Sequence, residues 1–80
     1  MSEINKLRWH CRRGSLELDL ILSRYLDTVY ALATPTEQQA FQRLLDLEDT
    51  DLLRYLLGED TPPDIDLVNL VQVLRLMPKS

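Results

Sequence analysis

The side chains best suited to chemistry in this 80-residue chain are its one histidine and its one cysteine, which are neighbours as His10 and Cys11. A cysteine nucleophile needs a base that faces it within hydrogen-bonding reach. Adjacent residues on a helix point in different directions, so this pair does not provide that geometry. A zinc site takes three or four nitrogen or sulfur ligands, and this pair supplies only two. We therefore expect neither an enzyme nor a metal-binding protein.

Other ligand-binding motifs are also missing from the sequence. The acidic residues at 46–51 lack the alternating spacing, the central glycine and the closing glutamate of a calcium loop. Gly14 has no second glycine near it, so a phosphate-binding glycine loop cannot form there. We expect the acids to form a solvated corner between two helices, and we expect no bound cofactor.

The most unusual stretch is residues 9–19, here called the motif segment, which combines a tryptophan, arginines, a glycine and two acids. Tryptophan and arginine are enriched in protein-binding hot spots, and a glycine permits close backbone approach. One interpretation is a docking surface. The other is a capped helix junction with a core tryptophan and an internal salt bridge, in which Glu17 meets an arginine of the first helix. The candidate partner-binding residues are Arg8, Trp9, Arg12, Arg13, Gly14, Glu17 and Asp19.

Charge and composition narrow the class of partner. Residues 1–13 carry a net charge of +3 and the remainder −7, with eight acids and one base between positions 46 and 66. Such a chain repels a phosphate backbone, so we expect no nucleic acid partner. A single cysteine cannot form an internal disulfide and is typical of a cytoplasmic protein. The sequence has neither a ~20-residue apolar run nor a signal-peptide pattern, so we expect no membrane insertion.

Hydrophobic periodicity predicts the elements that position the motif segment. We expect helices over about residues 3–12 and 15–30, a third from position 35, a fourth from 49 or 50, and a fifth ending at Pro78. Thr34, Pro35 and Glu37 form a capping-box pattern at the third helix. Ser15 is the expected cap of the second helix, either Asp64 or Asp66 caps the fifth, and Gly58 is expected to end the fourth. The fold class is all-α, a small five-helix bundle in a single domain over residues 1–80.

The same periodicity predicts the core. The valines near position 70 admit a strand, but their spacing favours a helix. The expected buried residues are Ile4, Leu7, Cys11, Leu18, Ile21, Leu22, Tyr25, Leu26, Val29, Ala40, Phe41, Leu44, Leu45, Leu52, Leu53, Leu56, Leu57, Leu67, Leu70, Val71 and Leu74.

Residues 13–17, Arg-Gly-Ser-Leu-Glu, match the R-G-x-x-E pattern of the FAD assembly factors of succinate dehydrogenase, the SdhE family. Residues 41–45 and 48–53 resemble the leucine pair, acidic turn and Asp-Leu segment of that family. The length and the five-helix layout agree as well. The sequence departs from the family at Tyr55, where tryptophan is frequent, and at Ser15, where a larger apolar residue is common.

This resemblance implies a function and a partner. Family members bind the flavoprotein subunit of succinate dehydrogenase, and in bacteria also that of fumarate reductase, and they promote covalent attachment of FAD to a histidine of that subunit. Their contact surface corresponds here to Arg13, Gly14 and Glu17. We expect a cytoplasmic monomer that acts as a chaperone, while the flavoprotein performs the chemistry. The alternative is an antitoxin-like or regulatory interaction adaptor on the same scaffold.

Overall fold

The computed structural model describes residues 3–77, which form five α-helices and one short 3-10 helix and contain no strand. The helices are α1 (Glu3–His10), α2 (Leu16–Thr28), the 3-10 helix η1 (Tyr30–Leu32), α3 (Pro35–Leu45), α4 (Asp49–Leu56) and α5 (Ile65–Leu76). The predicted all-α fold is therefore confirmed. None of the helices in this range is long and apolar enough to span a membrane.

Local side-chain caps fix where three helices begin. At α3, the Glu37 amide donates to the Thr34 hydroxyl, and the Thr34 amide donates back to the Glu37 carboxylate, both at 3.2 Å. The predicted capping box is thus present, with Pro35 in the first turn. Ser15 caps α2 and Asp64 caps α5. These start sites depend on short-range contacts, which is why the sequence reveals them.

Helix ends match the sequence less closely. Gly58 has φ +77°, a left-handed conformation that favours glycine, and it ends α4 as predicted. Gly14, in contrast, does not adopt positive φ. The chain instead leaves α1 after His10, two residues earlier than expected. Pro78, the predicted end of α5, lies outside the described residues.

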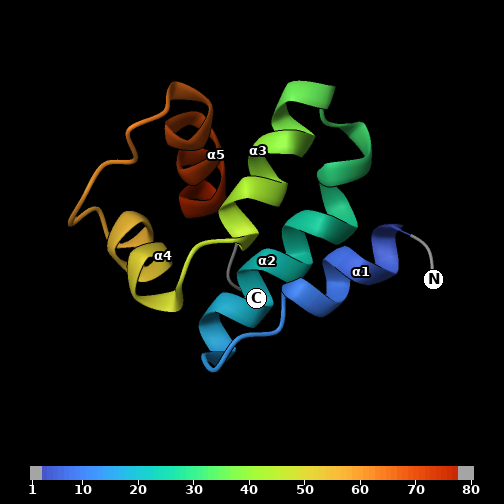
Figure 1. The fold of residues 1–80 in the computed structure, drawn as a ribbon, viewed down its shortest axis with the longest axis horizontal. Coiled ribbons are helices and arrows are strands. Elements are labelled where there is room, and N and C mark those ends of the chain that lie inside the picture. The colour runs from blue at the N-terminus through green and yellow to red at the C-terminus, as the bar shows by residue number, and fades with distance from the viewer. Residues whose placement is uncertain (1–2, 78–80) are drawn as a thin grey trace.

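The helices pack around a central α2 and α3 (Figure 1). α5 packs against α3, α4 packs against α5, and α1 packs against α2. In the ribbon view, α1 and α4 lie at opposite ends of the long axis. The connection between α1 and α2, which contains the centre of the motif segment, lies at the lower edge of this view.

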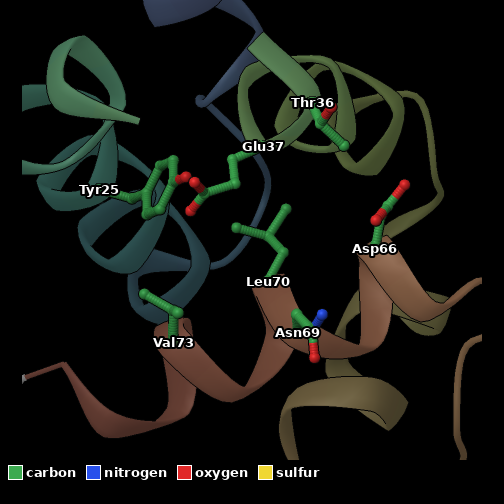
Figure 2. Close-up of a pocket in the computed structure, with 7 residues that line it drawn as sticks. All are labelled: Tyr25, Thr36, Glu37, Asp66, Asn69, Leu70 and Val73. Carbon is green, nitrogen blue, oxygen red and sulfur yellow. The ribbon is translucent and has the colours of Figure 1, made fainter. Parts of the chain in front are cut away.

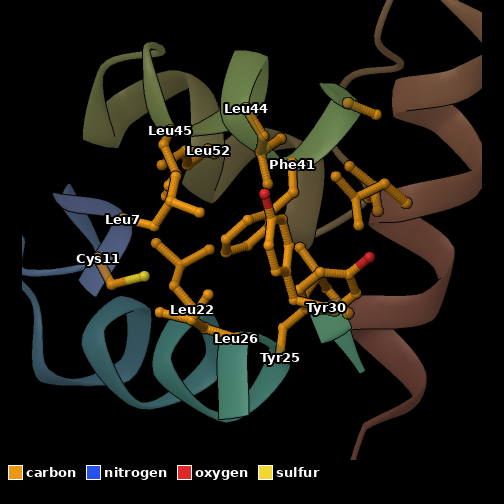
Figure 3. Close-up of a cluster of buried hydrophobic side chains, with 14 of the residues drawn as sticks. Leu7, Cys11, Leu22, Tyr25, Leu26, Tyr30, Phe41, Leu44, Leu45 and Leu52 are labelled. Atoms are coloured by element: carbon orange, nitrogen blue, oxygen red, sulfur yellow. The ribbon is translucent and has the colours of Figure 1, made fainter. Parts of the chain in front are cut away.

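Side chains from all five α-helices meet in one apolar core (Figure 3). The Phe41 ring stacks on Tyr25 with centroids 4.6 Å apart and lies 5.6 Å from the Tyr30 ring. Two predicted core residues are exposed instead: Ile4 at 41% and Leu57 at 64%. Ile4 lies in the first turn of α1 and Leu57 is the C-cap of α4, where a helix end extends past its neighbours.

Candidate protein-binding site

Arg13 joins the motif segment to the end of α3. Its guanidinium donates to the carbonyl oxygens of Leu45 and of Leu47, the latter at 2.9 Å. The same group lies 3.5 Å from the carboxylate of Asp49, at the start of α4. Only 14% of the Arg13 side chain is exposed. Carbonyls at a helix C-terminus have no partner within the helix, so this arginine satisfies groups that would otherwise need water.

Two carboxylates hold the backbone on either side of this arginine. Asp19 accepts a hydrogen bond from the backbone amide of Arg13. Asp49 accepts one from the amide of Gly14 at 3.3 Å. The internal ion pair of the junction therefore joins Arg13 to Asp49. The junction interpretation of the sequence had Glu17 in this role. Arg13 and Asp19 both make contacts that fix the path between α1 and α2.

Within residues 3–77, no backbone or side-chain contact requires glycine at position 14. Its φ is not positive, and a Cβ placed there would have Asp49 Oδ2 as its nearest neighbour, at 3.9 Å. That distance is an ordinary van der Waals contact. The exposed position of Gly14 instead leaves the backbone open to approach from outside.

Trp9 lies on the surface, with 64% of its area exposed, so the core position considered for it is wrong. The guanidinium carbon of Arg12 is 5.8 Å from the centre of the indole ring, within cation–π range. Trp9 and Arg12 line a surface hollow together with Arg8 and Asn5. Arg8 also pairs with Asp27 at 2.7 Å, and this hydrogen bond raises the pKa of Arg8.

Glu17 is exposed on α2, two residues past the Ser15 cap. Among residues 3–77, its carboxylate has neither a hydrogen-bond donor nor an ion-pair partner. The positive end of the α2 dipole stabilises a negative charge here. Glu17 is therefore the acid of the motif segment that remains available to an outside group, whereas Asp19 is engaged by the backbone of Arg13.

The adjacent His10 and Cys11 differ in environment. His10 is exposed, while Cys11 has 0% exposed area and lies in the core. Burial raises the pKa of the Cys11 thiol to about 11, although Arg8 and Arg13 oppose this effect. The thiol is therefore protonated near neutral pH and enclosed by apolar neighbours. Over residues 3–77, no group of three or more His, Cys, Asp or Glu side chains could hold a metal ion.

A small cavity of about 70 Å³ lies between α2, α3 and α5, where the side chains of Tyr25 and Glu37 face each other above Leu70 and Val73 (Figure 2). Burial, and then the Glu37 charge, raises the pKa of the Tyr25 hydroxyl. A cavity of this size holds a few water molecules and is far below the ~300 Å³ of a small ligand pocket. The absence of a cofactor remains a prediction.

The structure separates the seven candidate residues into two groups. Arg13 and Asp19 are turned into the α1–α2 junction. The outer group is Arg8, Trp9, Arg12, Gly14 and Glu17, all exposed. Sequence reasoning missed Asp49 as the anchor of this junction, since 36 residues separate it from Arg13. It also left Leu16, which is 73% exposed, out of the candidate binding residues. The hydrophobic pattern of α2 does indicate this exposure, because Leu16 lies outside the buried face of the helix.

These features define a small all-helical protein with an exposed surface of the composition that protein contacts use. Comparison with known proteins identifies the family. Residues 5–77 match the family described as flavinator of succinate dehydrogenase. The chain therefore belongs to this family, as the R-G-x-x-E pattern indicated.

Similar proteins carry a common name. The chain is 47% identical over 77 residues to the FAD assembly factor SdhE of Methylococcus capsulatus, covering 96% of this chain and 93% of that protein. It is 42% identical over 77 residues to the protein of that name in Xylella fastidiosa, covering 96% and 79%. It is 36% identical over 73 residues to that of Pseudomonas aeruginosa, covering 91% and 87%.

Proposed function

We propose that this chain is an assembly factor that binds the flavoprotein subunit of succinate dehydrogenase and promotes covalent attachment of FAD to it. The observation that carries the proposal is the match of residues 5–77 to the flavinator family. Relatives that align over most of their length are named FAD assembly factors. The flavoprotein subunit of fumarate reductase is a second partner in this proposal, bound in the same way.

The outer group of the motif segment forms the contact surface in this proposal. Trp9 and Arg12 offer a stacked aromatic and cationic pair, and Glu17 offers a free carboxylate. Gly14 allows the partner's backbone to come close without meeting a side chain. Arg13 and Asp19 support this surface from behind, because their contacts set the path between α1 and α2.

The chain acts by binding and not by catalysis. Its one thiol is buried and protonated, and the flavoprotein supplies the chemistry of flavin attachment. Preferential binding to the flavoprotein conformer that brings FAD and the acceptor histidine together raises the population of that conformer. The chain acts as a monomer in this proposal. We propose the cytoplasm as the location of this activity.

A complementation experiment tests the proposal. Cells that lack this protein receive wild type, Glu17→Ala or Glu59→Ala, and the flavoprotein subunit is examined for covalent flavin fluorescence on a denaturing gel. Glu59 is the matched control, because it is an exposed glutamate in the α4–α5 loop whose carboxylate has no partner among residues 3–77. Wild type and Glu59→Ala should restore the fluorescent band and Glu17→Ala should not. A band of equal intensity without the protein would refute the proposal.

A further inference from the structure

An apolar groove lies beside the motif segment, between α2, α4 and α5. Its floor is formed by Leu18, Ile21, Leu53, Leu56 and Leu74, and its volume is about 170 Å³. An apolar cavity of ~150 Å³ in another protein accepts a benzene-sized ring. The groove therefore has room for one large apolar side chain.

The groove is continuous with the motif segment along α2. Glu17 is both the free carboxylate of that segment and a lining residue of the groove. Ile21 lies one helical turn further, on the same face. On the adjoining face, Leu16 and Leu20 are exposed at 73% and 51%. A partner bound at Glu17 would thus meet apolar surface directly next to its polar contact.

Leu57 forms the outer edge of this groove and is 64% exposed. The helical pattern of α4 predicts a buried leucine here, but the chain turns away at Gly58 and leaves the side chain uncovered. Single exposed leucines are ordinary on a protein surface. This one is unusual because it borders a hollow that, apart from Glu17 and Arg75, is lined by leucine and isoleucine side chains.

Opposite charges mark the rim. Glu17 lies at one side, and Arg75 of α5 lies at another, near the end of α4. The Arg75 guanidinium covers Gly58, only 3.3 Å from the place where a Cβ would stand. Within residues 3–77, neither charge has an ion-pair partner. The rim is therefore complementary to a segment that carries a cation and an acceptor on either side of an apolar anchor.

We propose that the groove binds a large apolar side chain from a segment of the flavoprotein partner, with a basic residue of that segment at Glu17 and an acceptor at Arg75. This inference rests on the proposed function and extends its contact surface from α1 and α2 to α4 and α5. A second copy of this chain is disfavoured as the occupant. Each copy carries a net charge of −4, and the acids Glu59 and Asp60 lie two and three positions after Leu57.

Binding of the purified flavoprotein subunit to purified variants tests the groove. Leu57→Glu places a charge at its edge, and Leu32→Glu is the control, since Leu32 is 89% exposed in η1 and does not line the groove. We expect Leu57→Glu to weaken binding by about tenfold or more and Leu32→Glu to change it less than about twofold. Circular dichroism confirms that each variant is folded.

Thiol protection provides a second readout that does not depend on an introduced charge. Cys11 is buried, so a maleimide reports on Leu57→Cys or Leu32→Cys alone. Excess flavoprotein should slow the labelling at position 57 and leave that at position 32 unchanged. Equal protection at both positions, or none at position 57, would overturn the inference.

The outcomes of these binding experiments also distinguish a failure of the groove proposal from a failure of the proposed function. If wild type binds the flavoprotein and Glu17→Ala does not, but Leu57→Glu binds as wild type, the groove is not part of the interface and the proposed function stands. If wild type itself does not bind, the proposed function fails. If wild type dimerises and Leu57→Glu is monomeric, the occupant is a second copy and the inference is wrong.

Discussion

Replacing Arg13 with alanine should destabilise the whole domain, because this side chain joins the α1–α2 junction to residues 45–49, more than 30 positions away. Its guanidinium contacts the carbonyls of Leu45 and Leu47 and the carboxylate of Asp49. Removing it leaves two carbonyls at the end of α3 without their donor. The defect is therefore expected in the free energy of unfolding, in the absence of any partner.

The magnitude follows from these contacts. A hydrogen bond to a charged group contributes ~1.5–3 kcal/mol, and Arg13 makes two of them to carbonyls in a site where 14% of its side chain is exposed. Water can replace part of the lost hydrogen-bond energy. The buried Nε of Arg13 also lacks an acceptor within residues 3–77, so its removal reduces the net loss. We expect a loss of about 3 kcal/mol. For a domain of 60–100 residues, that loss lowers Tm by roughly 12–24 °C.

Thermal and urea unfolding, followed by far-UV circular dichroism, measures the effect. Arg12→Ala is the matched control, because within residues 3–77 the side chain of this neighbouring arginine forms a cation–π contact with the exposed Trp9 ring and no ion pair. Such a contact contributes at most about 1 kcal/mol. Arg13→Lys should fall between wild type and Arg13→Ala, since one ammonium cannot reproduce the planar fork of a guanidinium. If Arg13→Ala lowers stability no more than Arg12→Ala does, the anchoring role assigned to Arg13 is refuted.

Two further predictions concern single residues. Gly58→Ala should cost about 1–2 kcal/mol in urea unfolding, since φ is +77° there, whereas Gly14→Ala should leave stability almost unchanged; equal effects would contradict the difference in backbone conformation. Asp64 pairs with Arg43 at 2.6 Å and caps α5, which lowers its pKa below the ordinary 3.8. Its stabilising contribution is therefore complete above that pH and is lost as pH falls through the lowered pKa. Asp64→Asn should flatten the dependence of stability on pH in this acidic range, and an unchanged slope would show that the pairing is not formed.

The sequence predicted those features of the fold that depend on neighbouring residues. The cap at Ser15, the capping box of Thr34 and Glu37, and the turn at Gly58 all involve contacts within a few positions. Helical periodicity likewise placed most of the core correctly. It failed for Leu57 because burial at a helix end depends on which element lies next to it.

The candidate site was harder to predict because its organisation depends on long-range contacts. The pattern around residues 13–17 located the motif segment, but it did not distinguish inward from outward side chains. Arg13 is engaged because Leu45, Leu47 and Asp49 lie next to it in the folded chain, more than 30 positions away. Glu17 remains free for the same reason, since the junction uses Asp49 in its place.

Reconstitution with purified components shows directly whether this chain promotes covalent attachment of FAD to the flavoprotein. The flavoprotein subunit without covalent flavin is incubated with FAD, with or without this chain, and covalent flavin is measured after denaturation. We expect wild type to raise the covalent yield, whereas Glu17→Ala, although folded, should not. A yield that is the same with wild type, with Glu17→Ala and without the chain would contradict this expectation.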